Sequence, residues 1–585
     1  MITDNFRVLV VDLVTGHGTV STVEGRDSVA GGSGLAALLF QKFGHPDRPW
    51  SDPDQPLIFA IGPLTGYFPL MSKTVCAFKS PYHNQYAESH GGGRSALALR
   101  FANYDALVIT GKAARPSCLI VGSHRLNVRD VSYLWGKDVY ETGKMLRGIS
   151  KGAGHRSILR IGPAGEAGSA MAAINVDTYR HFGRLGGGGV MGTKNLKAIT
   201  ISGDGSFALP DSPDYPRLFQ ELYVKLTDTD MMSKYHDIGT PVNVAVLNAL
   251  KMLPIRNLQC TTDPGISAIS GEKFADEALL RNAACAGCPV GCIHIGFVRE
   301  RFQEQHQYVY RQVSYDHEPI FAVGAMLAVL DPFAVLAIID VAEKMGLDVM
   351  SAGVALAFAS EAFEKGAVTE KETIVRLAFG DSVKYREAME HLGRGTNDFY
   401  RMLGQGTLEA ARHYGAGDYA CVLGQEMAGY ATGEVFMASQ ALGLRHSHLD
   451  SGGYAYDQKE TGKDVSRAVD FMIKDEQGRV LLTSMVACLF ARGVYTDETL
   501  TRCLNSLGYK SLADNLDGIS RNVQKLRWAM RLATGFMPEN VTIPKRFTEV
   551  QTVKGPIDEA YLSEIMDQYS RAIRAMSSPV PGGAE

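Results

Sequence analysis

Short apolar runs rich in β-branched residues recur along the first two hundred positions of the chain. Each run is bounded by Gly, Pro or Asp, which is typical of buried strands that end in turns. We predict strands at residues 7–12, 57–61, 106–110, 118–121, 157–161 and 198–202. Glycine clusters at 91–93 and 186–189 interrupt them. These could be simple surface turns, but we expect loops that face a ligand, because glycine leaves backbone N–H groups accessible.

From about residue 212 the apolar positions recur at helical spacing, and the clearest pattern is a pair of helices. The dipeptide Asp331-Pro332 predicts the start of the first helix, and Gly346 predicts its end. We predict the second helix over residues 351–365, starting at Ser351, with Asp348 in the link between the two. Further helices are expected at residues 466–474 and 522–534.

This change of period predicts an α+β fold with a β-rich N-terminal domain followed by two mainly α-helical domains. We place the three domains at residues 1–205, 206–400 and 401–585. A chain of 585 residues is long enough for several domains with a large core.

Composition and charge exclude some classes of protein. Hydrophobic residues make up 45% of the chain and charged residues 21%, which is ordinary for a globular protein. The net charge of −4 argues against a nucleic-acid-binding protein. No apolar stretch is long enough for a membrane span, and residues 1–7 lack a signal pattern, so we expect a cytoplasmic protein. No G-x-G-x-x-G directly follows a predicted strand and opens a predicted helix, so we do not expect the chain itself to bind NAD.

The run Cys285-Ala-Gly-Cys288-Pro-Val-Gly-Cys292 is the strongest chemical signal in the chain. Its spacing, C-x2-C-x3-C, suits three ligands of an iron–sulfur cluster, with a fourth from a distant position. Structural zinc is the first alternative, but it normally uses two short-spaced pairs, and the chain has no second C-x-x-C. Inert buried thiols are the other alternative, and the close spacing of three cysteines disfavours it.

Several segments together resemble one known family. They are Ile161-Gly-Pro-Ala-Gly-Glu166, the stretch from Arg180 to Ile199 with its glycine run, the cluster at 91–93 and the stretch 101–112. With the cysteine run, they resemble the aldehyde:ferredoxin oxidoreductase family over almost the whole chain. The resemblance implies tungsten, or molybdenum, held by two pyranopterin dithiolenes beside one [4Fe–4S] cluster. It also implies that the β-rich domain forms a base for the pterins.

The resemblance assigns the cluster ligands. Cys285, Cys288 and Cys292 match the three clustered cysteines of the family. Cys488 stands in a context that resembles the family's fourth ligand. The other cysteines that could take this place are Cys76, Cys118, Cys260, Cys421 and Cys503.

The family has two pterin-contacting motifs of the form Asp-x-x-Gly-Leu-(Asp or Cys). The first matches Glu343 to Asp348, including Leu347, with Glu in place of Asp. The second matches Thr483 to Cys488, including Ala487. Here Thr replaces the leading Asp, and Val-Ala replaces Gly-Leu. The remaining cofactor contacts that the resemblance implies are Lys73, His90, Gly91, Gly92, Arg180, His181, Gly183, Arg184, Gly186 and Gly187.

Two of these positions depart from the family. Lys73 stands where the family has an arginine that bridges cluster and pterin, and lysine keeps the charge but loses bidentate geometry. His90 stands where the family has an asparagine whose backbone carbonyl helps to hold Mg²⁺ between the pterin phosphates. A carbonyl survives this change, so Mg²⁺ is still expected, with a second carbonyl from residues 180–183.

By the resemblance, the metal takes no protein ligand, and nearby side chains supply acid and base. Glu318 matches a glutamate near the metal, and His448 matches a histidine there. Each has a structural alternative. Glu318, beside Asp316, could be a partner in a buried ion-pair network, and His448 could be an ordinary histidine with His446 as its rival.

The resemblance implies oxidation of a small-molecule aldehyde to a carboxylic acid. Glu318 would act as base, His448 would hydrogen-bond the aldehyde oxygen, and electrons would leave through the cluster to a ferredoxin or an iron–sulfur partner subunit. One alternative is a tungsten-dependent reductase of an aromatic acyl-CoA. Another is an electron-transfer or structural subunit that carries only the cluster. A homo-oligomer is left open.

Overall fold

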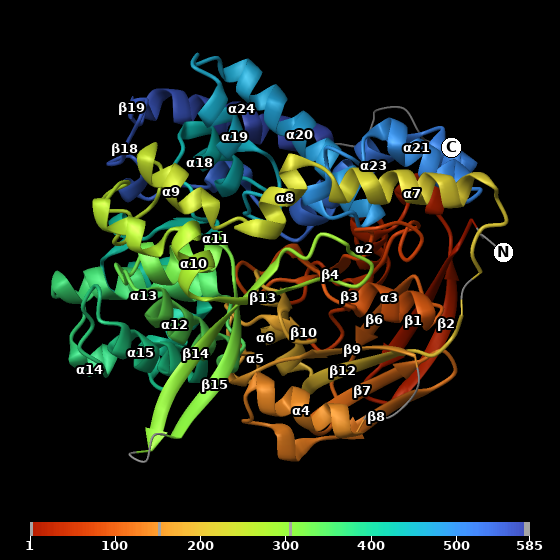
Figure 1. Ribbon diagram of the computed structural model, residues 1–585, viewed down its shortest axis with the longest axis horizontal. Coiled ribbons are helices and arrows are strands. Elements are labelled where there is room, and N and C mark those ends of the chain that lie inside the picture. The colour runs from red at the N-terminus through yellow and green to blue at the C-terminus, as the bar shows by residue number, and fades with distance from the viewer. Residues whose placement is uncertain (1–3, 150–153, 207, 304–306, 578–585) are drawn as a thin grey trace.

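Two six-stranded sheets form the N-terminal part of the protein (Figure 1). The computed structural model describes residues 4–149, 154–206, 208–303 and 307–577. The first sheet has the order β2-β1-β6-β3-β4-β5, with β1 (Phe6–Asp12), β2 (His17–Val23), β3 (Leu57–Ala60), β4 (Thr74–Lys79), β5 (Tyr86–Gly91) and β6 (Ala106–Thr110). The second has the order β11-β10-β9-β12-β7-β8, with β7 (Ser117–Gly122), β8 (Leu126–Asp130), β9 (His155–Arg160), β10 (Ile174–Val176), β11 (Arg180–Phe182) and β12 (Leu196–Gly203). All six predicted strands are confirmed.

The two sheets share one core, and the first sheet is buried on both faces. In β1, Leu9 and Val11 join the core between the sheets, while Phe6 and Val8 join the core beneath the helices. Successive side chains of a strand point to opposite faces, so the near-continuous apolar runs of the sequence reflect burial on both sides.

Helix α2 (Gly32–Phe43) lies between the first sheet and two long C-terminal helices, α20 (Val465–Met485) and α23 (Leu516–Ala533). Its first residue, Gly32, has φ of +44°, and a Cβ there would lie 2.1 Å from the carbonyl oxygen of Thr483. Gly62 makes a similar approach, 2.5 Å from the carbonyl oxygen of Met485. The β-rich base therefore touches the end of α20 backbone to backbone.

The rest of the chain is rich in helices, and the fold class is as predicted. The base contains α3 (Ser95–Phe101). The helices that follow the base include α7 (Asp214–Thr227), α8 (Asp230–Asp237), α11 (His317–Ile320), α12 (Pro332–Met345), α13 (Val349–Glu364), α18 (Glu434–Ala441), α19 (Gly453–Lys459), α21 (Asp497–Ser506) and α24 (Glu559–Ser577). None of the described helices is long and apolar enough to cross a lipid bilayer.

The predicted helix pair is present, with one boundary moved. Asp331 caps α12 by accepting a hydrogen bond from the Ala334 N–H at 2.7 Å, and Gly346 ends it at φ of +72°. Helix α13 begins at Val349 rather than at Ser351. The Asp348 carboxylate accepts the N–H groups of residues 350 and 351 at 3.2 Å each, so the helix starts two residues earlier than predicted.

A three-stranded antiparallel sheet interrupts the helices and was not predicted. It consists of β13 (Leu279–Ala283), β14 (Ile293–Gln303) and β15 (Gln307–Tyr315). In Figure 1 the β14–β15 hairpin projects from the body at the lower left. The two strands of this hairpin expose Arg299, Tyr308 and Tyr310, so the apolar alternation that identifies a strand is weak here.

The glycine run at 186–189 is not the expected loop. Gly186 precedes α6 (Gly187–Thr193) at φ of +83°. A Cβ on Gly188 would lie 2.4 Å from the carbonyl oxygen of Ala173, and one on Gly192 would lie 1.8 Å from that of Gly165. These glycines let a helix lie directly on neighbouring backbone, and close packing explains them without a ligand.

Candidate functional site

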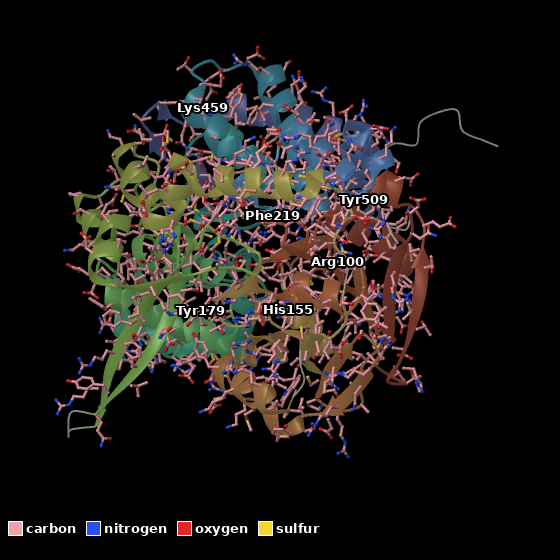
Figure 2. The ribbon with its side chains drawn as sticks, turned by 45° about the vertical axis from the view of Figure 1, so that its right-hand side comes forward. Arg100, His155, Tyr179, Phe219, Lys459 and Tyr509 are labelled. Atoms are coloured by element: carbon pink, nitrogen blue, oxygen red, sulfur yellow. The ribbon has the colours of Figure 1, made fainter. Side chains whose placement is uncertain are left out.

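A cavity of about 560 Å³ lies between the β-rich base and the helices. Most of the predicted site residues line it, namely Lys73, His90, Gly92, Arg180, His181, Gly183, Arg184, Cys285, Cys288, Cys292, Glu318, Glu343, Leu347, Asp348, His448, Thr483, Ala487 and Cys488. Gly91, Gly186 and Gly187 do not line it. Tyr179, labelled in Figure 2, donates a hydrogen bond to Gln312 of β15 at 3.1 Å, which joins the second sheet to the hairpin at the cavity wall.

The cysteine run forms a tight loop between β13 and β14. Gly287 and Gly291 both have φ of +68°, a backbone conformation that glycine adopts without strain. The N–H of Cys288 donates to the carbonyl of Cys285 at 3.2 Å, which closes the first turn of the loop. The loop therefore brings three thiols to one side of the cavity.

Backbone hydrogen bonds fix Cys488 beside this loop. The Cys488 N–H donates to the carbonyl of Leu70 at 3.0 Å, and the Leu70 N–H donates to that of Gly287 at 3.2 Å. The loop also donates from Ala286 to the carbonyl of Gly93 at 3.0 Å. Among the described cysteines, the cavity is lined by these four and by none of the other candidates for a fourth ligand, Cys76, Cys118, Cys260, Cys421 and Cys503.

Two cations lie among the thiols. Burial raises the pKa of Cys285, but Lys73 and Arg180 lower it more, and the net shift is downward. The Arg180 guanidinium also lies 3.9 Å from Sγ of Cys292. Gly92 leaves room for this group, because a Cβ there would lie 2.7 Å from Sγ of Cys285 and 3.2 Å from Nζ of Lys73. The two cations therefore stabilise the thiolate of Cys285, whereas burial raises the pKa of Cys288 to about 12 and that of Cys292 to about 11.

The described side chains of His, Cys, Asp and Glu include no group of three that converges on a single metal ion. The four cysteines all line the same cavity. Four thiolates are the usual ligands of a [4Fe–4S] cluster. Their arrangement fits the group that the sequence predicts at this place.

The motif at residues 343–348 is held against the base by two partly buried polar contacts, one of them an ion pair. Oε2 of Glu343 lies 2.8 Å from Nε2 of His181, and Oδ2 of Asp348 lies 3.3 Å from Nε of Arg184. Two buried guanidinium nitrogens of the wall, Nε of Arg180 and Nη1 of Arg184, have no hydrogen-bond partner within the described structure. Buried donors of this kind normally have a partner, so these two are available to an anionic cofactor group.

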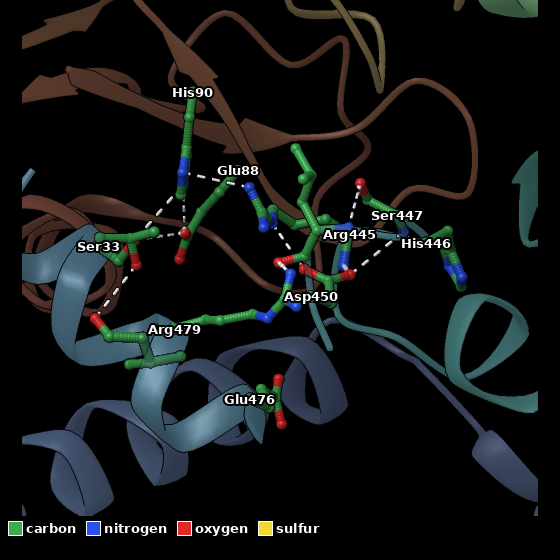
Figure 3. Close-up of polar contacts among 12 residues, drawn as sticks. Ser33, Glu88, His90, Arg445, His446, Ser447, Asp450, Glu476 and Arg479 are labelled. Carbon is green, nitrogen blue, oxygen red and sulfur yellow. Dashed lines mark hydrogen bonds and ion pairs between the residues drawn. The ribbon is translucent and has the colours of Figure 1, made fainter. Parts of the chain in front are cut away.

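The second motif is connected to the base by a chain of polar contacts, shown in Figure 3. Ser33 of α2 donates to Oε2 of Glu88 at 2.9 Å, and its Oγ lies 3.0 Å from Oγ1 of Thr483. Nε2 of His90 lies 3.1 Å from the same Glu88 oxygen. Glu88, which is buried and lines the cavity, thus places a carboxylate close to Thr483.

His90 continues this chain to the loop that carries His448. Burial and the neighbouring Arg445 lower the pKa of His90 to about 4, so its ring is neutral at pH 7. Nδ1 of His90 therefore accepts a hydrogen bond from Nη1 of Arg445 at 3.2 Å. Arg445 in turn pairs with Asp450 at 2.6 Å, and both are buried. The Arg445–Asp450 ion pair closes the loop that contains His448.

His448 and Glu318 meet in the cavity. Nε2 of His448 lies 3.3 Å from Oε1 of Glu318, which lies in the short helix α11. Nδ1 of His448 is buried and has no partner in the described structure. The rival His446 does not line the cavity, because its Nδ1 faces the carbonyl of Gln440 and its Nε2 accepts from the buried Arg531. The geometry therefore singles out His448.

The two carboxyl groups beside β15 differ in charge. Burial raises the pKa of Glu318, but the contact with His448 lowers it more, and the result is about 2. Burial and the charge of Glu318 raise the pKa of Asp316 to about 7. At neutral pH Glu318 is thus ionised, whereas Asp316 is about half protonated.

Sequence reasoning missed several residues of the wall. The sequence identified Asp316 only as a neighbour of Glu318. Its position two residues before Glu318 could have indicated that both carboxyl groups face the cavity. Tyr430 and Tyr454 also line the cavity, with ring centroids 4.9 Å apart and 5.1 and 6.0 Å from the His448 ring. No local pattern marks these tyrosines or Arg445, because tertiary packing alone places them there.

Comparisons with known proteins cover nearly the whole chain. A family model described as "Aldehyde ferredoxin oxidoreductase, N-terminal domain" matches residues 8–203, and one described as "Aldehyde ferredoxin oxidoreductase, domains 2 & 3" matches residues 217–574. The chain is 29% identical over 549 residues to the tungsten-containing aldehyde ferredoxin oxidoreductase of Pyrococcus furiosus, covering 90% of this chain and 88% of that protein.

Two further similarities extend this result. The chain is 29% identical over 523 residues to the aliphatic sulfonate oxidoreductase, WOR-like subunit, of the same organism, covering 84% of this chain and 77% of that protein. A solved structure, the active site complex BamBC of benzoyl-coenzyme A reductase with 1,5-dienoyl-CoA, superposes with a TM-score of 0.79. That match covers 97% of this chain and 95% of the other at 19% identity, so it shows a shared fold.

Proposed function

The chain belongs to the aldehyde ferredoxin oxidoreductase family, and on this premise we propose that it oxidises an aldehyde to a carboxylic acid. The observation that carries the proposal is the His448–Glu318 pair, 3.3 Å apart on the same cavity as four cysteines. An acid–base pair beside a candidate redox centre suits an oxidation in which protons and electrons leave together.

The residues of the cavity fit the cofactors of this family. Cys285, Cys288, Cys292 and Cys488 would hold a [4Fe–4S] cluster. The remaining predicted contacts that line the wall, together with the unpaired donors of Arg180 and Arg184, would hold a tungsten bis-pterin, with Mg²⁺ at its phosphates. When bound, the tungsten centre supplies the two-electron oxidant.

The chain's own side chains would handle the protons. In net terms, an aldehyde and a water become a carboxylic acid, two protons and two electrons. Glu318 is ionised at neutral pH and would accept a proton from the attacking water. His448 would donate a hydrogen bond to the aldehyde oxygen and stabilise the charge that develops there. Asp316 lies on the same wall and is a candidate to hold the second proton.

Electrons would leave by the cysteine loop, where Ala284 and Gly287 are exposed, to a ferredoxin or an iron–sulfur partner subunit. All described cysteines are free, which supports a reducing, cytoplasmic location.

The division into domains 1–205, 206–400 and 401–585 is part of this proposal. It is supported by the cavity, whose wall takes residues from each of the three segments.

Reduction of an aromatic acyl-CoA is the second candidate, since a solved protein of the same fold is a benzoyl-coenzyme A reductase. At 19% identity that likeness concerns the fold alone. A subunit that carries only the cluster is the third candidate, and it would leave the acid–base pair and the buried unpaired donors without a role.

The test is metal and cofactor analysis of anaerobically purified protein, followed by assays with an artificial electron acceptor. We expect about one tungsten, two pterins and four irons per chain, with turnover of aldehydes. Turnover of acyl-CoA esters without aldehydes would favour the second candidate. Iron without tungsten or pterin, in cells that make the cofactor, would favour the third.

A further inference from the structure

Seven lysine and arginine side chains line the cavity, and five of them already face a partner group. Lys73 and Arg180 lie among the thiols of the cysteine loop. Three others pair with aspartates at 2.6–3.3 Å, namely Arg184 with Asp348, Arg445 with Asp450 and Arg479 with Asp475. The remaining two are Lys234 and Arg492. Among the described residues, no carboxylate oxygen lies within 4.0 Å of either cation.

Both of these cations adjoin the same residue, Tyr235 of α8. Lys234 precedes Tyr235 in the helix, and the Arg492 guanidinium donates a hydrogen bond to the Tyr235 hydroxyl. The Tyr235 ring stacks on that of Phe490, with centroids 4.0 Å apart and an angle of 10° between the planes. All four side chains line the cavity and both cations are exposed, so this end of the cavity opens to solvent.

The acidic residues nearby do not neutralise the two charges. Asp230 and Asp237 of α8 are exposed but do not line the cavity, and neither pairs with Lys234. Asp276 and Glu277 of α10 (Gly271–Glu277) also lie outside the lining. None of the described carboxyl groups that do line the cavity pairs with either cation; they are Glu88, Asp316, Glu318, Glu343 and Asp348. Two cations at one end of the cavity are therefore available to an anion.

Aromatic rings line the cavity between this end and the acid–base pair. The Tyr454 ring lies 6.0 Å from that of His448 and 4.9 Å from that of Tyr430, centroid to centroid. Burial raises the pKa of Tyr235, and the neighbouring Tyr454 hydroxyl adds to this rise, so the two tyrosines are close. Tyr454 thus connects His448 to the cationic end. Such a wall favours a flat aromatic ring, which stacks on other rings.

We propose that the cavity takes an aromatic aldehyde whose ring carries an anionic group. The formyl group would lie at His448 and Glu318, the ring beside Tyr454, and the anion at Lys234 and Arg492. A guanidinium and an ammonium suit a carboxylate, which accepts several charge-assisted hydrogen bonds. This inference rests on the proposed function, because it names the class of aldehyde that is oxidised. The anionic group itself takes no part in the reaction and leaves with the product.

The test uses anaerobically purified holoenzyme with benzyl viologen as electron acceptor. The substrates are 3- and 4-formylbenzoate, each compared with its uncharged formylbenzamide of nearly the same shape. The test variant is Lys234→Gln/Arg492→Gln, and the matched control is Lys459→Gln/Arg129→Gln, at two exposed positions outside the cavity lining. Calorimetric binding of terephthalate, the product of 4-formylbenzoate, gives a readout that does not depend on turnover. Tungsten and pterin are measured in every variant.

In the wild type we expect kcat/KM for at least one formylbenzoate to exceed that for its amide about tenfold. The test variant should lose this preference and bind terephthalate about tenfold more weakly, and the control should keep both values. No preference in the wild type, or an unchanged preference in the test variant, would overturn the proposal. Loss of tungsten or pterin from the test variant would also overturn it, because the two cations would then hold the cofactor.

The aromatic part has its own comparison, between 4-formylbenzoate and the saturated 4-formylcyclohexanecarboxylate. In Tyr454→Leu, the ratio of kcat/KM for the first to that for the second should fall about threefold or more. Tyr223→Leu, at an exposed tyrosine of α7, should keep the wild-type ratio. An unchanged ratio in Tyr454→Leu would contradict recognition of the ring. Failure of the wild type to oxidise any aldehyde with viologen, uncharged ones included, would refute the proposed function instead.

Discussion

His448 and Glu318 come from distant parts of the chain, yet Nε2 of one lies 3.3 Å from Oε1 of the other. The contact keeps Glu318 ionised in spite of its burial. If this pair carries the acid–base chemistry, Glu318→Gln and His448→Gln should each lower kcat by about 10²–10⁴-fold. The measurement is turnover per tungsten, with metal content equal to that of the wild type.

Glu409→Gln and His413→Ala on α17 (Thr407–His413) are matched controls, since both lie outside the cavity lining. Both should turn over normally. Wild-type rates in fully loaded Glu318→Gln would show that the carboxylate is only a structural partner of the histidine.

The position of Cys488 predicts that it is the fourth cluster ligand. Cys488→Ser should lower the iron and acid-labile sulfide that each chain retains, because a cluster held by three thiolates is more easily lost. Cys260→Ser is the control, because Cys260 is also half-buried but does not line the cavity. The control should keep about four irons. Equal loss in both variants would argue against a specific ligand role.

Gly92 is predicted to be required for the cluster. An alanine Cβ there would lie 2.7 Å from Sγ of Cys285, and backbone on both sides is buried. Gly92→Ala should therefore displace a ligand and lower the iron content. Gly148→Ala, on the exposed end of α4 (Val139–Ile149), has no atom within 4 Å of the added methyl group and should retain full iron.

The Arg445–Asp450 pair is predicted to stabilise the loop that carries His448. Arg445 lowers the pKa of Asp450, which burial alone would raise. Arg445→Met would leave a buried carboxylate unpaired, at a cost of about 3–5 kcal/mol in the free energy of unfolding. Thermal unfolding should show this loss, and Arg467→Met, at an exposed arginine of α20, should cost about 1 kcal/mol or less. Adding Asp450→Asn to Arg445→Met should restore part of the stability.

A buried aspartate outside the site gives a pH test. Asp457 of α19 accepts the N–H of Phe436 at 2.9 Å and so caps α18, and burial raises its pKa to about 7. Because the folded state binds this proton more tightly, its contribution to stability is full below about pH 4 and is lost as the pH rises through 7. The melting temperature should fall between pH 5 and 8, and Asp457→Asn should reduce that fall by roughly 2–4 °C. Asp398→Asn, at an exposed position, should leave the fall unchanged.

The sequence predicted those features that depend on local pattern. β-branched runs identified the strands of the base, and Asp331 and Gly346 identified the ends of α12. The β14–β15 hairpin was not predicted, because its strands expose residues such as Arg299 and Tyr310. The glycines of α6 were misread because a glycine that allows backbone to approach backbone has the same sequence signature as one that allows a ligand to approach.

The same distinction between local pattern and tertiary packing holds for the site. The cysteine spacing could be read directly, and the resemblance to a family selected Cys488, Glu318 and His448. Glu88 could not be found in this way. Its proximity to Thr483 depends on Ser33, which α2 brings from the other end of the chain. Contacts of this kind appear only when the first sheet and the C-terminal helices are packed together.

The cavity wall combines Lys73 and Gly92 from early in the chain with Cys488 from late in it. A ribosome therefore completes the wall only after almost all of the protein has been made. A large cofactor bound in this cavity would contact both the base and the C-terminal helices, so the free energy of its binding would contribute directly to holding the two together. Protein purified without the cofactor should therefore unfold at a lower temperature than loaded protein.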